Sequence, residues 1–262
     1  MENRLTSLFK RKDKNILSIY FTAGYPNLND TKAIICELEK NGTDLIEIGM
    51  PFSDPVADGP VIQNSSEIAL KNGMTVNLLF EQLWQIRKSV SIPLLLMGYL
   101  NPVMQYGIEN FCNKCKEIGI DGCIIPDLPL EIYASEYKEI FEQNSLCNIF
   151  LVTPQTTNDR IRKIDELTTG FIYLVSSSST TGIKKREEIG QISYFDRIGG
   201  MNLTSKVLIG FGISDKTAFF KALDYANGAI IGSAFIKSLA DKGTIESKVK
   251  AFIQQFYINQ NT

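Results

Sequence analysis

The feature that most constrains the fold of this chain is an alternation that repeats eight times along its 262 residues. Short runs of apolar and β-branched residues are each followed by a segment with the spacing of an amphipathic helix, a pattern typical of β-then-α units. Eight such units in one chain of this length predict a closed parallel barrel of the α/β class, a (β/α)8 TIM barrel formed as a single domain over residues 1–262. The predicted strands are Ile16–Phe21, Asp44–Ile48, Ile92–Met97, Gly122–Ile125, Asn148–Thr153, Phe171–Ser176, Lys206–Gly210 and Gly228–Ile231.

The segments between these strands carry the helical period. An open, doubly wound sheet is the alternative, but the turn Thr22–Pro26 after the first strand lacks the glycine fingerprint of that fold. At the N-terminus, residues 1–15 form a capping segment in which Leu5–Phe9 is a short helix that closes the lower mouth of the barrel. The predicted helices between strands are Asp30–Lys40, Val61–Leu70, Val76–Lys88, Ile108–Ile118, Glu131–Glu142, Asn158–Leu167, Asp215–Tyr225 and Phe235–Phe256.

The chain contains no histidine, which narrows the chemistry available to it. Ser-His and Cys-His nucleophile pairs and His-ligated catalytic metals are excluded, so proton transfer falls to Asp, Glu, Lys, Tyr or Cys, and we expect no metal site. The five cysteines have no repeating spacing, and Cys112-x-x-Cys115 lies in a helical pattern without a second pair. We expect ordinary reduced thiols.

Charge and hydropathy indicate a soluble, cytoplasmic protein. The net charge is −2 without a basic stripe, which argues against nucleic acid or a membrane surface as a partner. Residues 1–15 are polar and basic, unlike a signal peptide, and no apolar run approaches the roughly 20 residues of a membrane helix.

Two carboxylates in the stretch 47–60 are the candidate acid and base. Glu47 lies inside an otherwise apolar strand, where burial of an anion is costly and needs a structural or functional reason. Asp58 follows in a loop rich in Pro and Gly, where aspartate is also an ordinary turn former, as is Asp54. Active residues of a TIM barrel come from the ends of strands and the loops after them, which is where Glu47 and Asp58 fall.

Further loops at the predicted catalytic face suggest an anion site. Gly210–Ser214 follows the seventh strand and Gly232–Ala234 follows the eighth, the two places where TIM barrels often bind phosphate through backbone N–H groups. Tyr173 lies on the sixth strand, and the serine-rich residues 176–182 after it are either a solvated linker or part of an active-site lid over residues 176–190. The segments Pro126–Pro129 and Met97–Pro102 add polar groups that are also explained by turns or helix caps.

Several of these segments together resemble the signature sequences of one family. Glu47–Gln63 is similar to the corresponding segment of the tryptophan synthase alpha chain family, and the likeness continues through Phe21–Pro26, Leu96–Pro102, Pro126–Pro129 and both glycine segments. The resemblance implies a (β/α)8 barrel that cleaves indole-3-glycerol phosphate to indole and glyceraldehyde 3-phosphate. It also implies no cofactor in this chain, and a beta chain that carries PLP as its partner in an alpha2-beta2 heterotetramer.

The resemblance also implies roles for individual residues. Glu47 and Asp58 are the acid/base pair, with Tyr173 near them. Gly182, Gly212, Gly232 and Ser233 hold the phosphate, and Thr181 belongs to the lid. One departure lies in that lid, where this chain has Ser177 and Ser179 and many relatives have a basic residue and a glycine.

Other functions were compatible with the residues alone. An aldolase of the metal type needs histidine ligands, and one of the Schiff-base type needs a lysine at the catalytic end of a strand, which none of the predicted strands has. A phosphosugar isomerase would explain the glycine loops. A subunit that only binds and activates the beta chain is a further alternative, because Asp54, Pro55 and Asn101 lie in loops of the catalytic face and form the predicted partner interface.

Overall fold

A closed barrel of parallel strands forms the centre of the molecule, in the computed structural model that describes residues 2–176, 184–210 and 212–257. Within these residues the strands follow one another around the barrel in chain order, from β1 to β8, and β8 pairs with β1. The TIM-barrel prediction is therefore confirmed. The strands are β1 Ile16–Thr22, β2 Leu45–Gly49, β3 Leu94–Met97, β4 Gly122–Ile124, β5 Cys147–Val152, β6 Phe171–Val175, β7 Lys206–Gly210 and β8 Gly228–Ile231.

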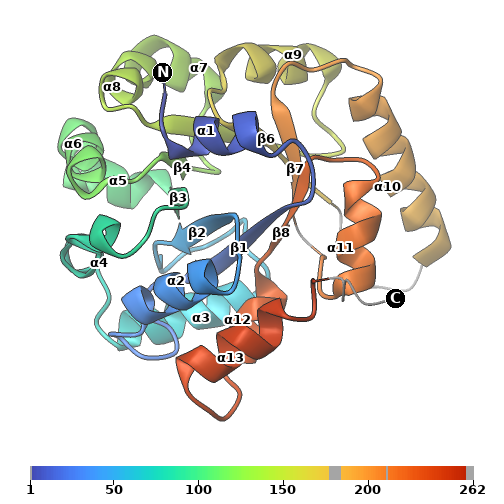
Figure 1. The fold of residues 1–262 in the computed structure, drawn as a ribbon. Helices are drawn as coiled ribbons and strands as arrows, with labels where there is room; N and C mark the ends of the chain where they lie inside the picture. Colours follow the sequence, from blue (N-terminus) through green and yellow to red (C-terminus); the bar gives the residue numbers. More distant parts are fainter. Residues whose placement is uncertain (1, 177–183, 211, 258–262) are drawn as a thin grey trace.

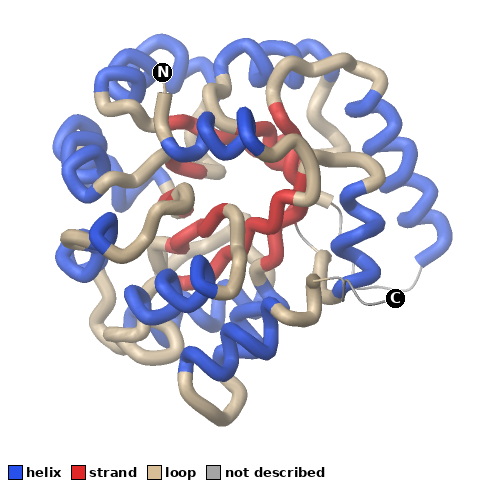
Figure 2. Tube along the Cα trace, in the orientation of Figure 1, coloured by secondary structure: helices blue, strands red, loops and turns tan. Residues whose placement is uncertain are grey.

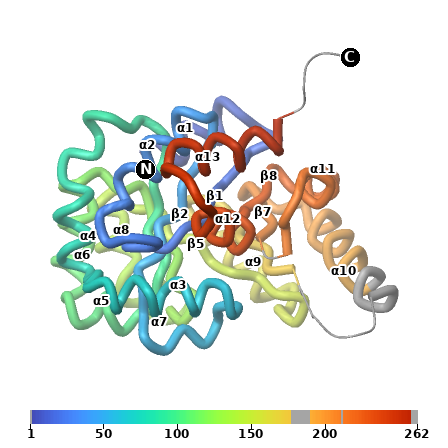
Figure 3. The backbone as a smooth tube through the Cα atoms, turned by 90° about the horizontal axis from the view of Figure 1, so that it is seen from below, coloured from blue at the N-terminus to red at the C-terminus, as the bar shows by residue number. Residues whose placement is uncertain are grey.

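Helices surround this barrel (Figures 1 and 2). They cover the outer face of the strands, so strands β1 to β4 and β8 are buried along their whole length. The C-terminal helix α13 packs beside α2 from the first half of the chain (Figure 3). The α-helices are α1 Arg4–Arg11, α2 Thr31–Lys40, α3 Pro60–Lys71, α4 Val76–Leu83, α5 Leu100–Tyr106, α6 Ile108–Ile118, α7 Leu130–Ile132, α8 Lys138–Gln143, α9 Asn158–Leu167, α10 Lys184–Gly199, α11 Lys216–Leu223, α12 Ser233–Leu239 and α13 Ile245–Ile253.

Two helix predictions and one loop prediction were wrong in detail. The segment 76–88 is not one helix, because Gln85 adopts a left-handed conformation with φ of 60° and a 3-10 turn, Ile86–Lys88, follows α4. The segment 235–256 is divided into α12 and α13, and Gly243 lies between them with φ of 126°. Asn101, which was predicted to lie in a loop, lies with Pro102 in the first turn of α5, where the missing N–H of proline costs little.

Two further stretches differ from the predicted pattern. Between α7 and α8 the backbone forms a π-helical turn, Tyr133–Tyr137, inside the segment predicted as a single helix. Helix α10 was not predicted, and it begins at Lys184, so the last part of the proposed lid segment 176–190 is helical.

Helix α1 lies across one opening of the barrel (Figure 1). Its N-cap Asn3 donates from Nδ2 to the carbonyl oxygens of Asp121 and Ser145, at 2.8 and 2.9 Å. Asp121 directly precedes β4, and Ser145 lies two residues before the start of β5. The helix predicted at Leu5–Phe9 therefore lies at the N-terminal ends of the strands, with Leu5 fully buried.

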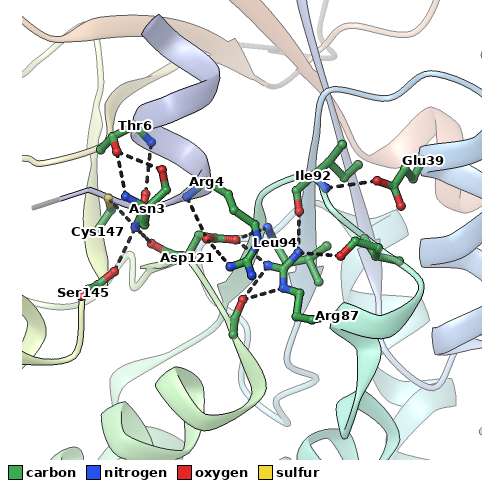
Figure 4. Close-up of polar contacts among 12 residues, drawn as sticks. Asn3, Arg4, Thr6, Glu39, Arg87, Ile92, Leu94, Asp121, Ser145 and Cys147 are labelled. Carbon is green, nitrogen blue, oxygen red and sulfur yellow. Dashed lines mark hydrogen bonds and ion pairs between the residues drawn. The ribbon is translucent and has the colours of Figure 1, made fainter. Parts of the chain in front are cut away.

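A buried carboxylate, Asp121, ties the N-terminal ends of the strands together (Figure 4). Only 1% of its side chain is exposed, and Arg87 Nη2 donates to Oδ2 at 2.5 Å, while Arg4 Nη1 lies 3.3 Å from Oδ1. The backbone N–H of Leu94, the first residue of β3, also donates to Oδ2 at 3.0 Å. Because the carboxylate has several donors and two cations beside it, its burial as an anion is compensated.

Candidate active site

A cavity of about 540 Å³ opens at the opposite, carboxyl-terminal end of the strands. Tyr20 and Tyr173 line it from β1 and β6, and residues of α12 and α13 form one wall. The remaining lining comes largely from strands β3 and β8, from the segments after β7 and β8, and from the start of α3, namely Met97, Ile230, Gly212–Ser214, Gly232–Ala234 and Gly59–Ile62. Active sites of TIM barrels form at this end.

Glu47 is a fully buried acid in the middle of β2. Its Cα neighbours Tyr20 on β1 and Leu95 on β3 lie at the same level of the barrel, so these three side chains point to the same, inner side. The hydroxyl of Ser18 donates to Glu47 Oε1 at 2.8 Å. Burial raises the pKa of Glu47 from 4.5 to about 8, and the Ser18 hydrogen bond opposes this rise. Such a group is largely protonated at neutral pH and suits both proton donation and proton acceptance.

Asp58 lies on the loop between β2 and α3 and is half-buried. The phenol of Tyr99 donates to Asp58 Oδ2 at 3.0 Å and accepts from the backbone N–H of Ala57, also at 3.0 Å. The Tyr99 ring stacks on Phe52, with 5.1 Å between ring centroids. Burial raises the pKa of Asp58, while the hydrogen bond from Tyr99 lowers it. Tyr99 therefore fixes the loop and favours the ionised carboxylate.

Both acids act electrostatically on the same pair of buried tyrosines. Burial raises the pKa of Tyr173 far above its usual value, and the charges of Glu47 and Asp58 raise it further. Burial, Asp58 and Glu47 likewise raise the pKa of Tyr20. Tyr20 and Tyr173 line the cavity, so the two carboxyl groups lie near its lining side chains, Glu47 from a strand and Asp58 from a loop.

Two glycines at strand ends make room for these tyrosines. A Cβ atom on Gly49 would lie 2.2 Å from the Tyr20 hydroxyl oxygen, and one on Gly210 would lie 2.1 Å from that of Tyr173. Both distances are far below van der Waals contact, so a larger residue at either position would displace the phenol.

The glycine segments after β7 and β8 meet at the same cavity. Gly212 has φ of 75°, a left-handed conformation that glycine adopts without strain. Gly232 packs closely on Tyr20, since a Cβ there would lie 3.2 Å from Tyr20 Cδ1, and Ser233 begins α12 with an exposed side chain. Glycine segments with a nearby hydroxyl at this place suit an anion such as phosphate.

Comparison with known proteins identifies the family. The model of the tryptophan synthase alpha chain family matches residues 6–261. The chain is 60% identical over 247 residues to the tryptophan synthase alpha chain of Flavobacterium psychrophilum, covering 94% of this chain and 97% of that one. The chain belongs to the tryptophan synthase alpha chain family.

Other relatives agree with this assignment. The tryptophan synthase alpha chain of Flavobacterium johnsoniae is 60% identical over 251 residues, which is 96% of this chain and 98% of the relative. Among solved structures, tryptophan synthase from Mycobacterium tuberculosis superposes with a TM-score of 0.86 at 28% identity, covering 98% of this chain and 97% of that one. Tryptophan synthase alpha chains cleave indole-3-glycerol phosphate to indole and glyceraldehyde 3-phosphate, partner with a beta chain, and are carbon–carbon lyases of tryptophan biosynthesis.

The residues that the family resemblance singled out fall into three groups. Tyr173, Gly212, Gly232 and Ser233 line the cavity, and Glu47 and Asp58 are not among its lining residues but lie near enough to Tyr173 to raise its pKa. Asp54 and Asn101 are exposed and Pro55 is half-buried, in a part of the surface where Val56 is 87% exposed. The third group lies outside the described residues and consists of Thr181, Gly182, Ser177 and Ser179.

Three residues around the acids were missed from the sequence: Ser18, Tyr20 and Tyr99. Ser18 and Tyr20 lie in a strand that reads as an apolar run, and no spacing rule connects them to Glu47 or Asp58. Tyr99 lies in the segment Met97–Pro102, whose polar groups turns or helix caps would also explain, and its side chain is only 5% exposed. A hydroxyl inside an apolar strand, as at Ser18, was the one available signal.

Other polar groups and the cysteines have structural explanations. Asp127 Oδ1 accepts from the backbone N–H of Leu100 at 2.8 Å and so caps α5, which is the helix-capping alternative. All five cysteines are free, as predicted. In the described part of the chain, no group of three or more Cys, Asp or Glu side chains is placed to hold a metal ion, and no helix is long and apolar enough to cross a membrane.

Proposed function

We propose that Glu47 and Asp58 carry out the cleavage of indole-3-glycerol phosphate in this chain. The observation that supports this most directly is that both carboxyl groups act on Tyr20 and Tyr173, which line a cavity that Gly212, Gly232 and Ser233 also line. A ring at the tyrosines and a phosphate at the glycines would place the bond between them beside the carboxyl groups.

Glu47 acts as the general acid and then as the general base. Cleavage is a retro-aldol reaction, in which indole C3 must gain a proton and the hydroxyl on the adjacent carbon must lose one. With a pKa raised by burial to about 8, Glu47 holds the proton for C3 at neutral pH. The bond from C3 to the glycerol carbon then breaks, and the Glu47 carboxylate accepts the hydroxyl proton as the aldehyde forms. The residue ends the cycle protonated, as it began.

Asp58 stabilises the intermediate. Protonation at C3 places positive charge on the ring, and an ionised Asp58 that accepts the indole N–H would lower the energy of that state. The hydrogen bond from Tyr99 favours this ionised form. Two carboxyl groups in unlike environments thus take unlike roles.

The phosphate and the partner complete the proposal. Backbone N–H groups of Gly212 and Gly232 and the Ser233 hydroxyl hold the phosphate, together with Gly182 of a lid that includes Thr181. The chain carries no cofactor or metal, works in the cytoplasm, and forms an alpha2-beta2 heterotetramer with a beta chain that binds PLP. The docking surface for that chain includes Asp54, Pro55 and Asn101, of which Asp54 and Asn101 are exposed.

The test is the release of indole from indole-3-glycerol phosphate, measured with and without the beta chain. We expect Glu47→Gln to lower turnover by about 10²–10⁴, the usual contribution of a general acid/base, while affinity for glycerol phosphate stays unchanged. The matched control is Glu166→Gln, an exposed glutamate on α9, which should behave as wild type. Wild-type turnover in the Glu47→Gln variant would remove Glu47 from the mechanism.

A further inference from the structure

Ser18 contacts only one of the two oxygens of Glu47. Its side chain is fully buried in β1, and its hydroxyl donates to Glu47 Oε1 at 2.8 Å. Glu47 Oε2 is equally buried and has no hydrogen-bond partner among the described residues. A buried oxygen that lacks a hydrogen bond is costly, so an acid held by one oxygen only needs an explanation.

The strand register places Ser18 on the side of Glu47 away from the cavity. Tyr20, which lines the cavity, is the Cα neighbour of Glu47, and Ser18 lies two residues nearer the N-terminal end of the same strand. Side chains two apart on a strand point to the same face. Ser18 therefore contacts Glu47 from the side of the N-terminal strand ends, inside the barrel.

We propose that Ser18 is a positioning residue for the cleavage reaction: it holds Oε1 of Glu47 and reserves Oε2 as the oxygen that gives and regains the proton. This rests on the role proposed for Glu47 above. In the neutral acid, Oε1 receives the serine hydroxyl and acts as the carbonyl oxygen, so the proton resides on Oε2. When the proton leaves, the bond to Oε1 becomes charge-assisted and stronger, which helps Glu47 release it.

The charged and titratable neighbours are consistent with this role. Tyr20 from β1 and Tyr173 from β6 lie near Glu47, because its charge raises the pKa of both phenols. The charge of Asp58 raises the pKa of both tyrosines as well. Burial raises the pKa of both phenols, so neither supplies a negative charge near neutral pH. Burial is the main cause of the raised pKa of Glu47, and Ser18 is the neighbour whose hydrogen bond lowers it.

The experiment compares Ser18→Ala with wild type in two measurements. The first is infrared spectroscopy of the resting protein without substrate, with the Glu47 carboxyl band assigned by its loss in Glu47→Gln. Loss of the hydrogen bond to Oε1 should move the C=O stretch of the neutral acid to higher frequency, and the midpoint of its ionisation should rise by about one pH unit or more. The second is the pH profile of turnover, whose Glu47 limb should move upward by the same amount, with about tenfold slower turnover at pH 7 and little change in KM.

Two variants and one control separate positioning from folding. Ser18→Thr keeps the hydroxyl and should restore the wild-type band and profile, while Ser18→Cys, a weaker donor of similar size, should give intermediate values and remains informative if the alanine variant does not fold. The control Thr168→Val deletes a different buried hydroxyl, which donates to the carbonyl oxygens of Asn148 and Phe171, and should move neither measurement.

The outcomes are distinct. An unchanged carboxyl band in Ser18→Ala, or an equal change in Thr168→Val, would overturn the assignment of Ser18. A shifted band with unchanged turnover and pH profile would also overturn it, because the contact would then have no effect on the reaction. Since the infrared measurement needs no substrate, failure of the proposed role of Glu47 would be seen separately, as full activity in Glu47→Gln.

Discussion

The burial of Glu47 predicts that this one residue makes the stability of the protein depend on pH. Its pKa is 4.5 when solvated and about 8 in the folded barrel, where burial disfavours the anion. Between these two values the unfolded chain releases a proton that the folded protein keeps. The free energy of unfolding of the wild type must therefore fall as the pH rises through this window, and the loss is complete above about pH 8.

The size of the effect follows from the same two values. At pH 7 the solvated carboxyl is two and a half pH units above its pKa of 4.5, and the buried one is still mostly protonated. At about 1.4 kcal/mol per unit, ionisation in the unfolded state lowers the stability of the wild type by about 3 kcal/mol relative to a non-titrating residue. Glutamine at position 47 removes this dependence. Any cost of burying its amide N–H groups does not change with pH.

Urea unfolding of wild type, Glu47→Gln and the exposed control Glu166→Gln from pH 5 to pH 9 measures the difference. The advantage of Glu47→Gln over wild type should grow by about 2.5 kcal/mol between pH 5 and pH 7, because part of the loss is already present at pH 5, and it should level off above the folded pKa of about 8. The control should run parallel to wild type. Parallel curves for Glu47→Gln and wild type would show that Glu47 ionises normally in the folded protein, and the reasoning about its burial would be refuted.

Two further changes test the supporting contacts. Asp121→Asn leaves the half-buried Arg87 without its counter-charge, and we expect a loss of about 3–5 kcal/mol in urea unfolding; a loss below about 1 kcal/mol would contradict the view that this carboxylate ties the strand ends together. Tyr99→Phe removes the phenol that donates to Asp58, so the pKa of Asp58 should rise further and the acid limb of the activity profile should move to higher pH. An acid limb that stays in place would argue that Tyr99 acts only on the backbone of Ala57.

The sequence predicted the repeating architecture well because the signal is periodic and local. Each strand is an apolar run of a few residues, and Glu47 stands out within one such run. The contacts that surround Glu47 could not be predicted in the same way, since Ser18 reaches it from a neighbouring strand through a register that spacing does not reveal. Likewise, the break at Gln85 depends on a left-handed residue that is neither glycine nor asparagine.

The family resemblance supplied what local patterns could not. The barrel rule made Asp58 a candidate partner of Glu47 but left it open as a turn former among prolines and glycines, and the resemblance to a known signature favoured the catalytic interpretation. The structure adds the physical reason, in the form of the Tyr99 phenol that holds its carboxylate. Gly212 and Gly232 were placed at the cavity by the barrel rule, since both follow strands whose ends meet on one side of the sheet.

The absence of side chains at Gly49 and Gly210 also governs the size of molecule that this barrel admits. The phenols of Tyr20 and Tyr173 occupy the space that those side chains would fill, and so withdraw from the opening. With alanine at either position, the ring of the neighbouring tyrosine would have to move toward the cavity entrance, and the cavity would be shallower. These two glycines, far apart in the chain, thus set how deeply a flat bicyclic molecule can bind in the cavity.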